Sequence, residues 1–134
     1  MGRGGVLTAS STRAVVVGYL EALNAHDADR VAACVAEDFV NEHTSVLGHS
    51  RRGRAEYRAA LDGFLSEFAE LHYELEELIV DGANAAAAYR VSFRRGGKPV
   101  RVRGVFRFRV DGEGLIAHRV DYWDSGEVTR QLAL

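Results

Sequence analysis

The sequence predicts an α+β domain in which three N-terminal helices pack on one face of a curved antiparallel sheet and enclose a pocket. Two observations predict this fold. Apolar residues recur three times at helical spacing in the first half of the chain, and from about residue 72 the pattern switches to period two. Turn signals then divide the second half into the strands of a meander, at Asp81-Gly82, Gly96-Gly97 and Asp111-Gly-Glu-Gly114.

The first element in chain order is an arm. Residues 1–9 are rich in glycine and lack periodicity, so we expect residues 1–10 to be a flexible arm ahead of one domain at 11–134. The hydroxyl groups of Ser10, Ser11 and Thr12 are suitable N-caps for a first helix. This helix buries Val16, Tyr19, Leu20 and Leu23.

Two more helices follow. The short second helix is capped by Asp27 or Asp29 and buries Val31, Cys34 and Val35. The third is expected from about residue 54 to 69, because one broad apolar stripe runs along it: Tyr57, Leu61, Phe64, Leu65 and Phe68.

The strands are expected near 38–43, 72–81, 84–95, 99–110 and 115–124. On the strand at 99–110, apolar residues alternate with arginines, so the apolar side faces the helices and the arginines face outward. Glu74 and Glu76 supply opposite charge on that outer face, which we therefore expect to be solvated or to face a dimer partner.

Composition excludes several classes of function. The 134 residues, 47% of them apolar, suit one compact domain. A net charge of -2 gives no field that attracts phosphate backbones or anionic lipid, so no nucleic acid or membrane partner is expected. With no signal peptide or apolar run of about twenty residues, a cytoplasmic protein is expected. Its histidines lack the spacing of metal ligands.

Three segments resemble a known superfamily. They are Tyr19-Leu-Glu-Ala-Leu-Asn-Ala25, Asp38-Phe-Val-Asn-Glu-His43 and Val120-Asp-Tyr-Trp-Asp124. Together they resemble the NTF2-like superfamily, specifically its ketosteroid isomerase and SnoaL-like polyketide cyclase branch, over about residues 12 to 125. The resemblance implies a cone-shaped fold and a homodimer through the outer sheet face. Members share this fold more reliably than they share an activity.

The resemblance also implies site residues. Tyr19 stands where ketosteroid isomerases carry the tyrosine that donates a hydrogen bond to the substrate oxyanion. His43 stands at the position of the general-base aspartate, and strand alternation places Asn41 beside it, unless the strand shifts and Glu42 points inward. Gly104 stands at the position of the second oxyanion donor, which is therefore missing.

The last hairpin brings a carboxyl group to the same region. Counting across its loop pairs Val110 with Leu115 and sets Gly104 opposite Asp121. In this register Arg119, Asp121 and Trp123 face inward. The predicted site then comprises Tyr19, Asn41, His43 and Asp121 within a wall of Phe64, Tyr89, Phe93, Phe106 and Trp123, which suits a polycyclic ketone, polyketide or steroid-like ligand.

This set predicts acid–base chemistry without metal or cofactor. A histidine with an ordinary pKa can take a proton from a carbon next to a carbonyl, as an isomerase or an aldol cyclase requires. A protonated Asp121 would join Tyr19 in stabilising the enolate, whereas an ionised Asp121 would orient His43. The sequence leaves both states open.

Two other functions compete with this one. The segments Gly104-Val-Phe106 and Asp121-Tyr-Trp-Asp124 also resemble limonene-epoxide hydrolases, whose site activates water with an aspartate, arginine, aspartate set. Asp121 matches one aspartate, but residues 89–92 offer no second carboxylate, so that set is incomplete. The third possibility is a dimeric module that binds a ligand without turning it over.

Overall fold

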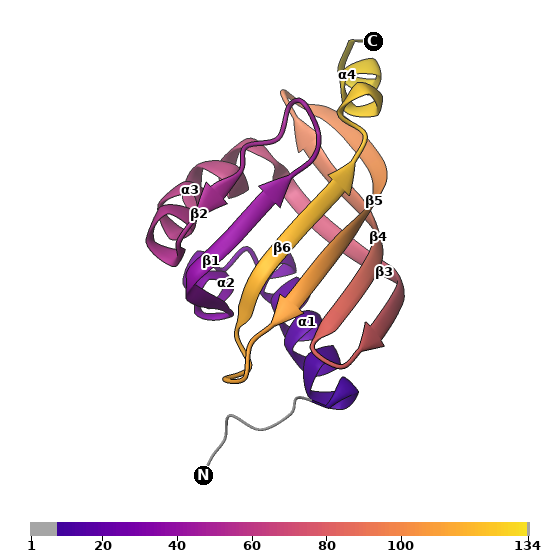
Figure 1. The fold of residues 1–134 in the computed structure, drawn as a ribbon. Helices are drawn as coiled ribbons and strands as arrows, with labels where there is room; N and C mark the ends of the chain where they lie inside the picture. The colour runs from indigo at the N-terminus through magenta and orange to yellow at the C-terminus, as the bar shows by residue number, and fades with distance from the viewer. Residues whose placement is uncertain (1–7, 134) are drawn as a thin grey trace.

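The computed structural model describes residues 8–133, and so most of the expected N-terminal arm lies outside the described residues. The expected helices and strands follow one another in the predicted order, with a further two-residue strand after the first strand and one further helix at the C-terminal end (Figure 1). The helices are α1 (Ala9–Asn24), α2 (Ala28–Ala33), α3 (Arg54–Glu67) and α4 (Ser125–Ala133). The strands are β1 (Val35–His43), β2 (Arg51–Arg52), β3 (Ala69–Asp81), β4 (Asn84–Arg95), β5 (Lys98–Val110) and β6 (Ile116–Trp123).

Two helix ends differ from the sequence-based expectation. Helix α1 is capped by Thr8, whose hydroxyl accepts from the Ser11 amide at 3.0 Å, so the helix begins before the expected cap residues. Thr12 instead is buried and donates to the Gly82 carbonyl. Helix α4 was not predicted, although Asp124 caps it by accepting from the amides of Gly126 and Glu127.

The strands form one six-stranded sheet in the order β2-β1-β6-β5-β4-β3. Strands β3 to β6 form the predicted antiparallel meander, whereas β1 joins the sheet parallel to β6. The curved sheet and the helices α1 and α3 form two layers (Figure 1). The parallel pairing is important for the site because it sets β1 directly beside β6.

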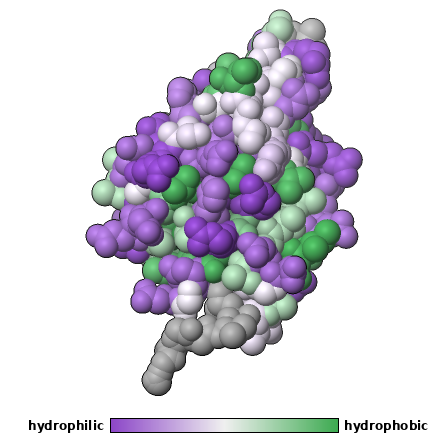
Figure 2. Space-filling model, in the orientation of Figure 1, coloured by the Kyte–Doolittle hydropathy of each residue, from purple (hydrophilic) through white to green (hydrophobic). Residues whose placement is uncertain are grey.

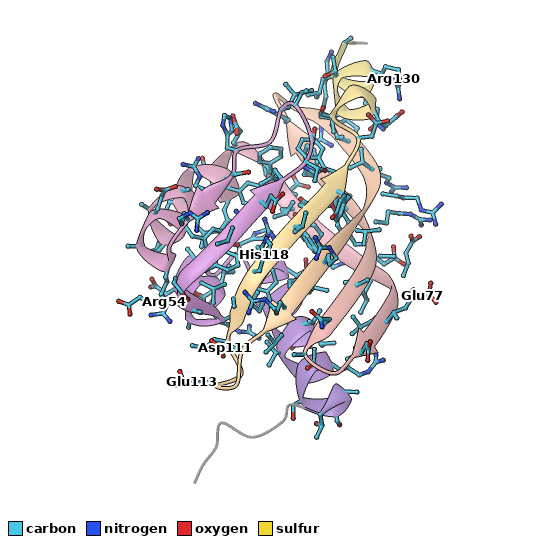
Figure 3. All side chains as sticks on the ribbon, viewed as in Figure 1. Arg54, Glu77, Asp111, Glu113, His118 and Arg130 are labelled. Carbon is cyan, nitrogen blue, oxygen red and sulfur yellow. The ribbon has the colours of Figure 1, made fainter. Side chains whose placement is uncertain are left out.

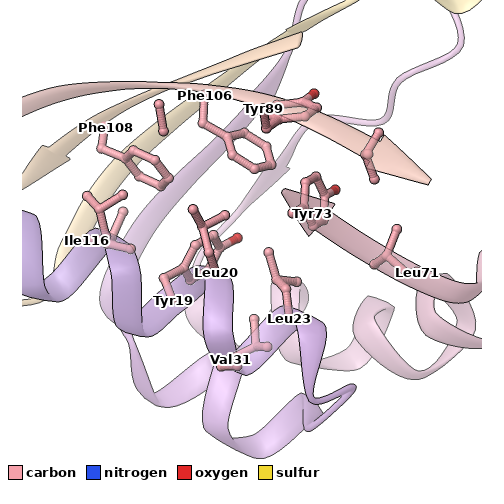
Figure 4. Close-up of a cluster of buried hydrophobic side chains, with 14 of the residues drawn as sticks. Tyr19, Leu20, Leu23, Val31, Leu71, Tyr73, Tyr89, Phe106, Phe108 and Ile116 are labelled. Atoms are coloured by element: carbon pink, nitrogen blue, oxygen red, sulfur yellow. The ribbon is translucent and has the colours of Figure 1, made fainter. Parts of the chain in front are cut away.

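The core lies between α1 and the inner face of the sheet (Figure 4). Tyr19, Leu20 and Leu23 of α1 meet Phe106 and Phe108 of β5 there. All five side chains are at most 5% exposed. This burial is the main favourable contribution to folding, and it fixes the height of the helix above the sheet.

The predicted pairing of the last hairpin is wrong by two residues. Gly104 pairs with Trp123, and Asp121 pairs with Phe106, because Val110 pairs with Ile116 and not with Leu115, and an irregularity between Arg109 and Val110 shifts the register by one more residue. A shift of two residues keeps every side chain on its face. Asp121 therefore still points inward, although it does not stand opposite Gly104.

The outer face of the sheet carries paired charges. Glu76 contacts Arg90 and Arg103, each at 3.1 Å, as the strand pattern predicts. Polar and apolar residues alternate over the face shown in Figure 2. The exposed apolar residues of the sheet are Leu75, Ile79 and Tyr122. No helix within residues 8–133 is long and apolar enough to cross a membrane.

Candidate functional site

A cavity of about 640 Å³ lies between the inner face of the sheet, helix α3 and the loop that follows β1. Most of the predicted site residues line it, namely Asn41, His43, Phe64, Tyr89, Phe93, Asp121 and Trp123. Tyr19 and Phe106 do not line it. Both are fully buried behind the cavity wall, so they support the residues that face the ligand space.

The orientation of β1 is the one that period-two alternation favours. Phe39 and Asn41 are buried and His43 is half-buried, all on the inner face. Glu42 points to the other face, where its Oε1 lies 3.1 Å from Nε2 of His118 on β6 (labelled in Figure 3). The alternative in which Glu42 faces the cavity is therefore excluded.

Arg119 is the site residue that the sequence reasoning undervalued. Its guanidinium group is buried on the cavity wall, with the residue 5% exposed. It donates to the Tyr19 hydroxyl and to Asn41 Oδ1, each at 2.5 Å, and its NH2 group lies 3.3 Å from His43 Nε2. One buried cation thus joins α1, β1 and β6.

The packing around Arg119 is aromatic. Its Cζ atom lies 4.7 Å from the ring centre of Phe106, with Tyr19 and Tyr57 at 5.8 and 6.0 Å. Such faces stabilise a guanidinium group by cation–π attraction. Its Nε atom is buried and has no hydrogen-bond partner among the described residues. A buried donor without a partner is unusual.

Tyr19 and Tyr57 form a short hydrogen-bonded pair, with their hydroxyl oxygens 2.5 Å apart. The Tyr19 oxygen already accepts from Arg119, and its own proton has the Tyr57 oxygen as its only acceptor among the described residues. The Tyr57 hydroxyl proton then has no acceptor among the described residues, and Tyr57 is one of the residues that line the cavity. The chain of donors therefore runs from Arg119 through Tyr19 to Tyr57.

Asp121 is held at the cavity wall by Tyr89. The Tyr89 hydroxyl donates to Asp121 Oδ1 at 2.6 Å, and both residues are at most 5% exposed. The other carboxylate oxygen, Oδ2, lies 3.5 Å from His43 Nδ1. The carboxyl group thus has one oxygen fixed by Tyr89 and the other turned toward His43.

His43 is surrounded mainly by hydrogen-bond donors. Trp123 Nε1 donates to its Nδ1 at 3.2 Å, and Arg119 lies on its Nε2 side. Burial, followed by the charges of Arg119, His49 and Arg51, lowers the pKa of His43 to about 3. His43 is therefore a neutral ring at neutral pH and a weak base.

Asp121 has the opposite shift. Burial raises its pKa to about 6, against the charge of Arg119 and the Tyr89 hydrogen bond, which both lower it. Of the two predicted acid–base groups, Asp121 is the one that titrates close to neutral pH. A carboxyl group poised there in a cavity is typical of a functional site.

The described residues include no group of three or more histidine, cysteine, aspartate or glutamate side chains that could hold a metal ion.

Comparison with known proteins identifies the family. The model of the SnoaL-like domain matches residues 16–119. The chain belongs to the SnoaL-like family. No curated protein matches the chain in sequence.

Solved structures share the SnoaL-like fold over nearly the whole chain. A protein of Shewanella denitrificans assigned as a SnoaL-like polyketide cyclase superposes with a TM-score of 0.82 at 18% identity, covering 91% of this chain and 96% of its own. An LEH-like epoxide hydrolase of Mycobacterium tuberculosis has a TM-score of 0.81 at 23% identity, covering 93% of this chain and 91% of its own.

A third structural neighbour is an epoxide hydrolase/cyclase-like enzyme of pyran ring formation in the polyether salinomycin. Its TM-score is 0.77 at 22% identity, with 88% of this chain and 94% of that chain covered. At these identities the three likenesses establish the fold alone.

Proposed function

We propose that this SnoaL-like protein transfers a proton next to a carbonyl group of a small apolar ligand, with Asp121 as the base. The single observation that carries the proposal is the buried carboxyl group on the cavity wall, with a pKa near 6. Such a group is ionised at neutral pH and is still basic enough to take a proton from carbon.

The proposed step is balanced within the ligand and the side chains. Asp121 Oδ2 takes the proton from the carbon next to the carbonyl, and the electron pair of the broken C–H bond moves to the carbonyl oxygen. The enolate then takes the proton back at another carbon, which is isomerisation, or its carbon attacks a second carbonyl. In that second case the proton goes to the new alkoxide oxygen, which is aldol ring closure.

The enolate oxygen needs a donor, and we assign this role to Tyr57. Tyr57 lines the cavity, and its hydroxyl group is polarised by the chain of donors from Arg119 through Tyr19. The guanidinium charge behind the chain favours negative charge on the oxygen. Tyr19 therefore contributes to oxyanion stabilisation through Tyr57 and does not touch the ligand.

His43 has a positioning role in this proposal. As a neutral ring between Trp123 and Arg119, it contacts both neighbours and lies beside Asp121 Oδ2. It keeps the carboxyl group away from bulk water without competing for the proton.

Deuterium exchange tests the proposal. The native protein is incubated in D₂O with a panel of bicyclic and polycyclic ketones, and exchange at the carbon next to the carbonyl is followed by NMR. Replacing Asp121 by asparagine should lower the exchange rate by about two to four orders of magnitude, as loss of a general base does. Asp124→Asn, which removes an exposed carboxylate three residues along, is the matched control.

Exchange that continues at the native rate in Asp121→Asn would refute the assignment of the base. Binding of the ketones without exchange in the native protein would favour a module that holds a ligand without turning it over.

A second reaction has one observation in its favour. Arg119 supplies from β6 the arginine that an epoxide-opening site needs, because Arg90, the arginine within residues 89–92, pairs with Glu76 on the outer face of the sheet. The second carboxylate is still missing, because Glu67, the other acid in the cavity wall, pairs with Arg95 at 2.9 Å. Attack by a hydroxyl of the ligand itself on an epoxide requires only one base, so hydroxy-epoxides belong in the same panel.

A further inference from the structure

A row of three donor residues crosses the cavity wall at one end. Asn41 of β1 pairs with Arg51 of β2 on one side and with Arg119 of β6 on the other. All three side chains line the cavity. We call Arg51, Asn41 and Arg119 the donor row.

The donor row offers N–H groups and no free acceptor. Arginine only donates, so the atom of Asn41 that faces Arg119 is its carbonyl oxygen Oδ1, at 2.5 Å. The amide nitrogen of Asn41 then points away from Arg119, and no described residue accepts from it. The buried Nε of Arg119 also has no partner in the described part of the chain.

Positive charge exceeds negative charge at this end of the cavity. The side chain of half-buried Arg51 makes no hydrogen bond or ion pair with any residue that the structure describes. His49 also lines the cavity here, and the charges of Arg119 and Arg51 lower the pKa of His43. The acid that faces them is Asp121, which Tyr89 holds.

The donor row lies at a defined distance from the proposed base. Asp121 pairs with His43, two residues further along the strands than the pair of Asn41 and Arg119. Two residues along a strand correspond to about 7 Å. A ligand can therefore place one group at the donor row and its reactive carbon at Asp121.

We propose that the donor row binds a carboxylate of the ligand, so that the substrate class is an apolar ketone acid with its anionic group about 7 Å from the reactive carbon. This inference rests on the proposed function for the identity of the reactive carbon. The binding of the anion itself follows from the donors and charges of the row.

A matched pair of ligands tests the inference. One is a tetralone with a carboxylate on its aromatic ring, and the other is the same ketone with a primary carboxamide at that position. Isothermal titration should show that the native protein binds the acid about tenfold more tightly than the amide. Arg51→Gln should reduce this preference to about threefold or less.

Two further variants make the result specific. Arg52→Gln removes the same charge from the neighbouring exposed residue of β2 and should leave the preference unchanged. Asn41→Asp replaces the amide donor by a carboxylate of the same size beside Arg119, and it should abolish binding of the acid while binding of the amide persists.

Equal binding of acid and amide, no binding of either, or an unchanged preference in both Arg51→Gln and Asn41→Asp would overturn the inference. Deuterium exchange in the same samples separates it from the proposed function. A preference for the acid without exchange supports the donor row and contradicts proton transfer. Deuterium exchange without preferential binding of the acid supports proton transfer and contradicts the donor row.

Discussion

The hydroxyl group of Tyr89 occupies the space that a side chain on Gly104 would need. A Cβ atom placed on Gly104 would lie 2.4 Å from that hydroxyl oxygen and 2.7 Å from the carbonyl oxygen of Tyr122. Only a residue without a side chain allows Tyr89 to reach Asp121. The position where ketosteroid isomerases carry their second oxyanion donor is therefore filled, in this protein, by a tyrosine that holds a carboxyl group.

We predict that Gly104→Ala destabilises the protein by about 1–3 kcal/mol, because the methyl group overlaps both Tyr89 and backbone. Urea unfolding measures the change in free energy. Gly18→Ala in α1 is the matched control, because a Cβ there meets nothing within 4 Å. That control should be neutral or stabilising by up to about 1 kcal/mol. Equal stability of Gly104→Ala and native protein would contradict the packing described for Tyr89.

Asp121 should make the native protein less stable as the pH rises. Its folded pKa of about 6 lies above the ordinary value of 3.8, so the folded state keeps a proton that the unfolded chain has released. The stabilisation is complete below about pH 4 and is lost as the pH rises through about 6, by roughly 3 kcal/mol. Asp121→Asn should lack this loss in urea unfolding measured across that range. If the free energy of unfolding falls with pH equally in native protein and in Asp121→Asn, the raised pKa of Asp121 is contradicted.

His43 should make the native protein less stable as the pH falls, which is the opposite of the effect of Asp121. Its folded pKa of about 3 lies below the ordinary 6.5, so between these values the unfolded chain binds the proton and the folded state does not. The stability is present above pH 6.5 and is lost as the pH falls toward 3, by about 5 kcal/mol at most. His43→Gln should therefore be less sensitive to acid than native protein in thermal unfolding. Equal acid sensitivity of the two would show that His43 is not buried as a neutral ring.

We predict that Tyr57→Phe lowers the rate of ketone exchange by about one hundredfold to one thousandfold, since it removes the oxyanion donor. Tyr19→Phe should have a smaller effect, because it leaves the Tyr57 hydroxyl in place and removes only its polarisation. Tyr73→Phe is the control. It makes the same chemical change in the same cavity, outside the hydrogen-bonded chain, and should keep nearly the native rate. A loss in Tyr73→Phe equal to that in Tyr57→Phe would contradict the assigned donor.

Strand alternation alone predicted which side chains of β1 and β6 face the cavity. Asn41 and His43 follow from the period of β1, and Asp121 follows from the period of β6. Asp121 points to the predicted face of the sheet although the predicted register is wrong, because the error is two residues and side chains return to the same face every two residues. Two features together caused the error, the closing pair Val110–Ile116 and the irregularity next to it, and neither has a signal in the turn sequence.

The position of Tyr19 and the importance of Arg119 required the structure. The helical pattern predicts that Tyr19 is buried, but it does not reveal that Tyr57 of α3 lies between Tyr19 and the cavity. Arg119 shares the inward face of β6 with Asp121, and that shared face was the signal for it. Because arginine is abundant in this chain, the sequence did not distinguish Arg119, which is buried, from the arginines that the structure shows at the surface.

The protonation of Asp121 is the most direct test of this account. The carboxyl carbon of Asp121 is assigned in the NMR spectrum as the aspartate signal that disappears in Asp121→Asn, and its chemical shift is followed with pH. The account predicts a midpoint near 6. A midpoint at or below the ordinary value of 3.8 would contradict the claim that this carboxyl group is poised to exchange a proton with a ligand.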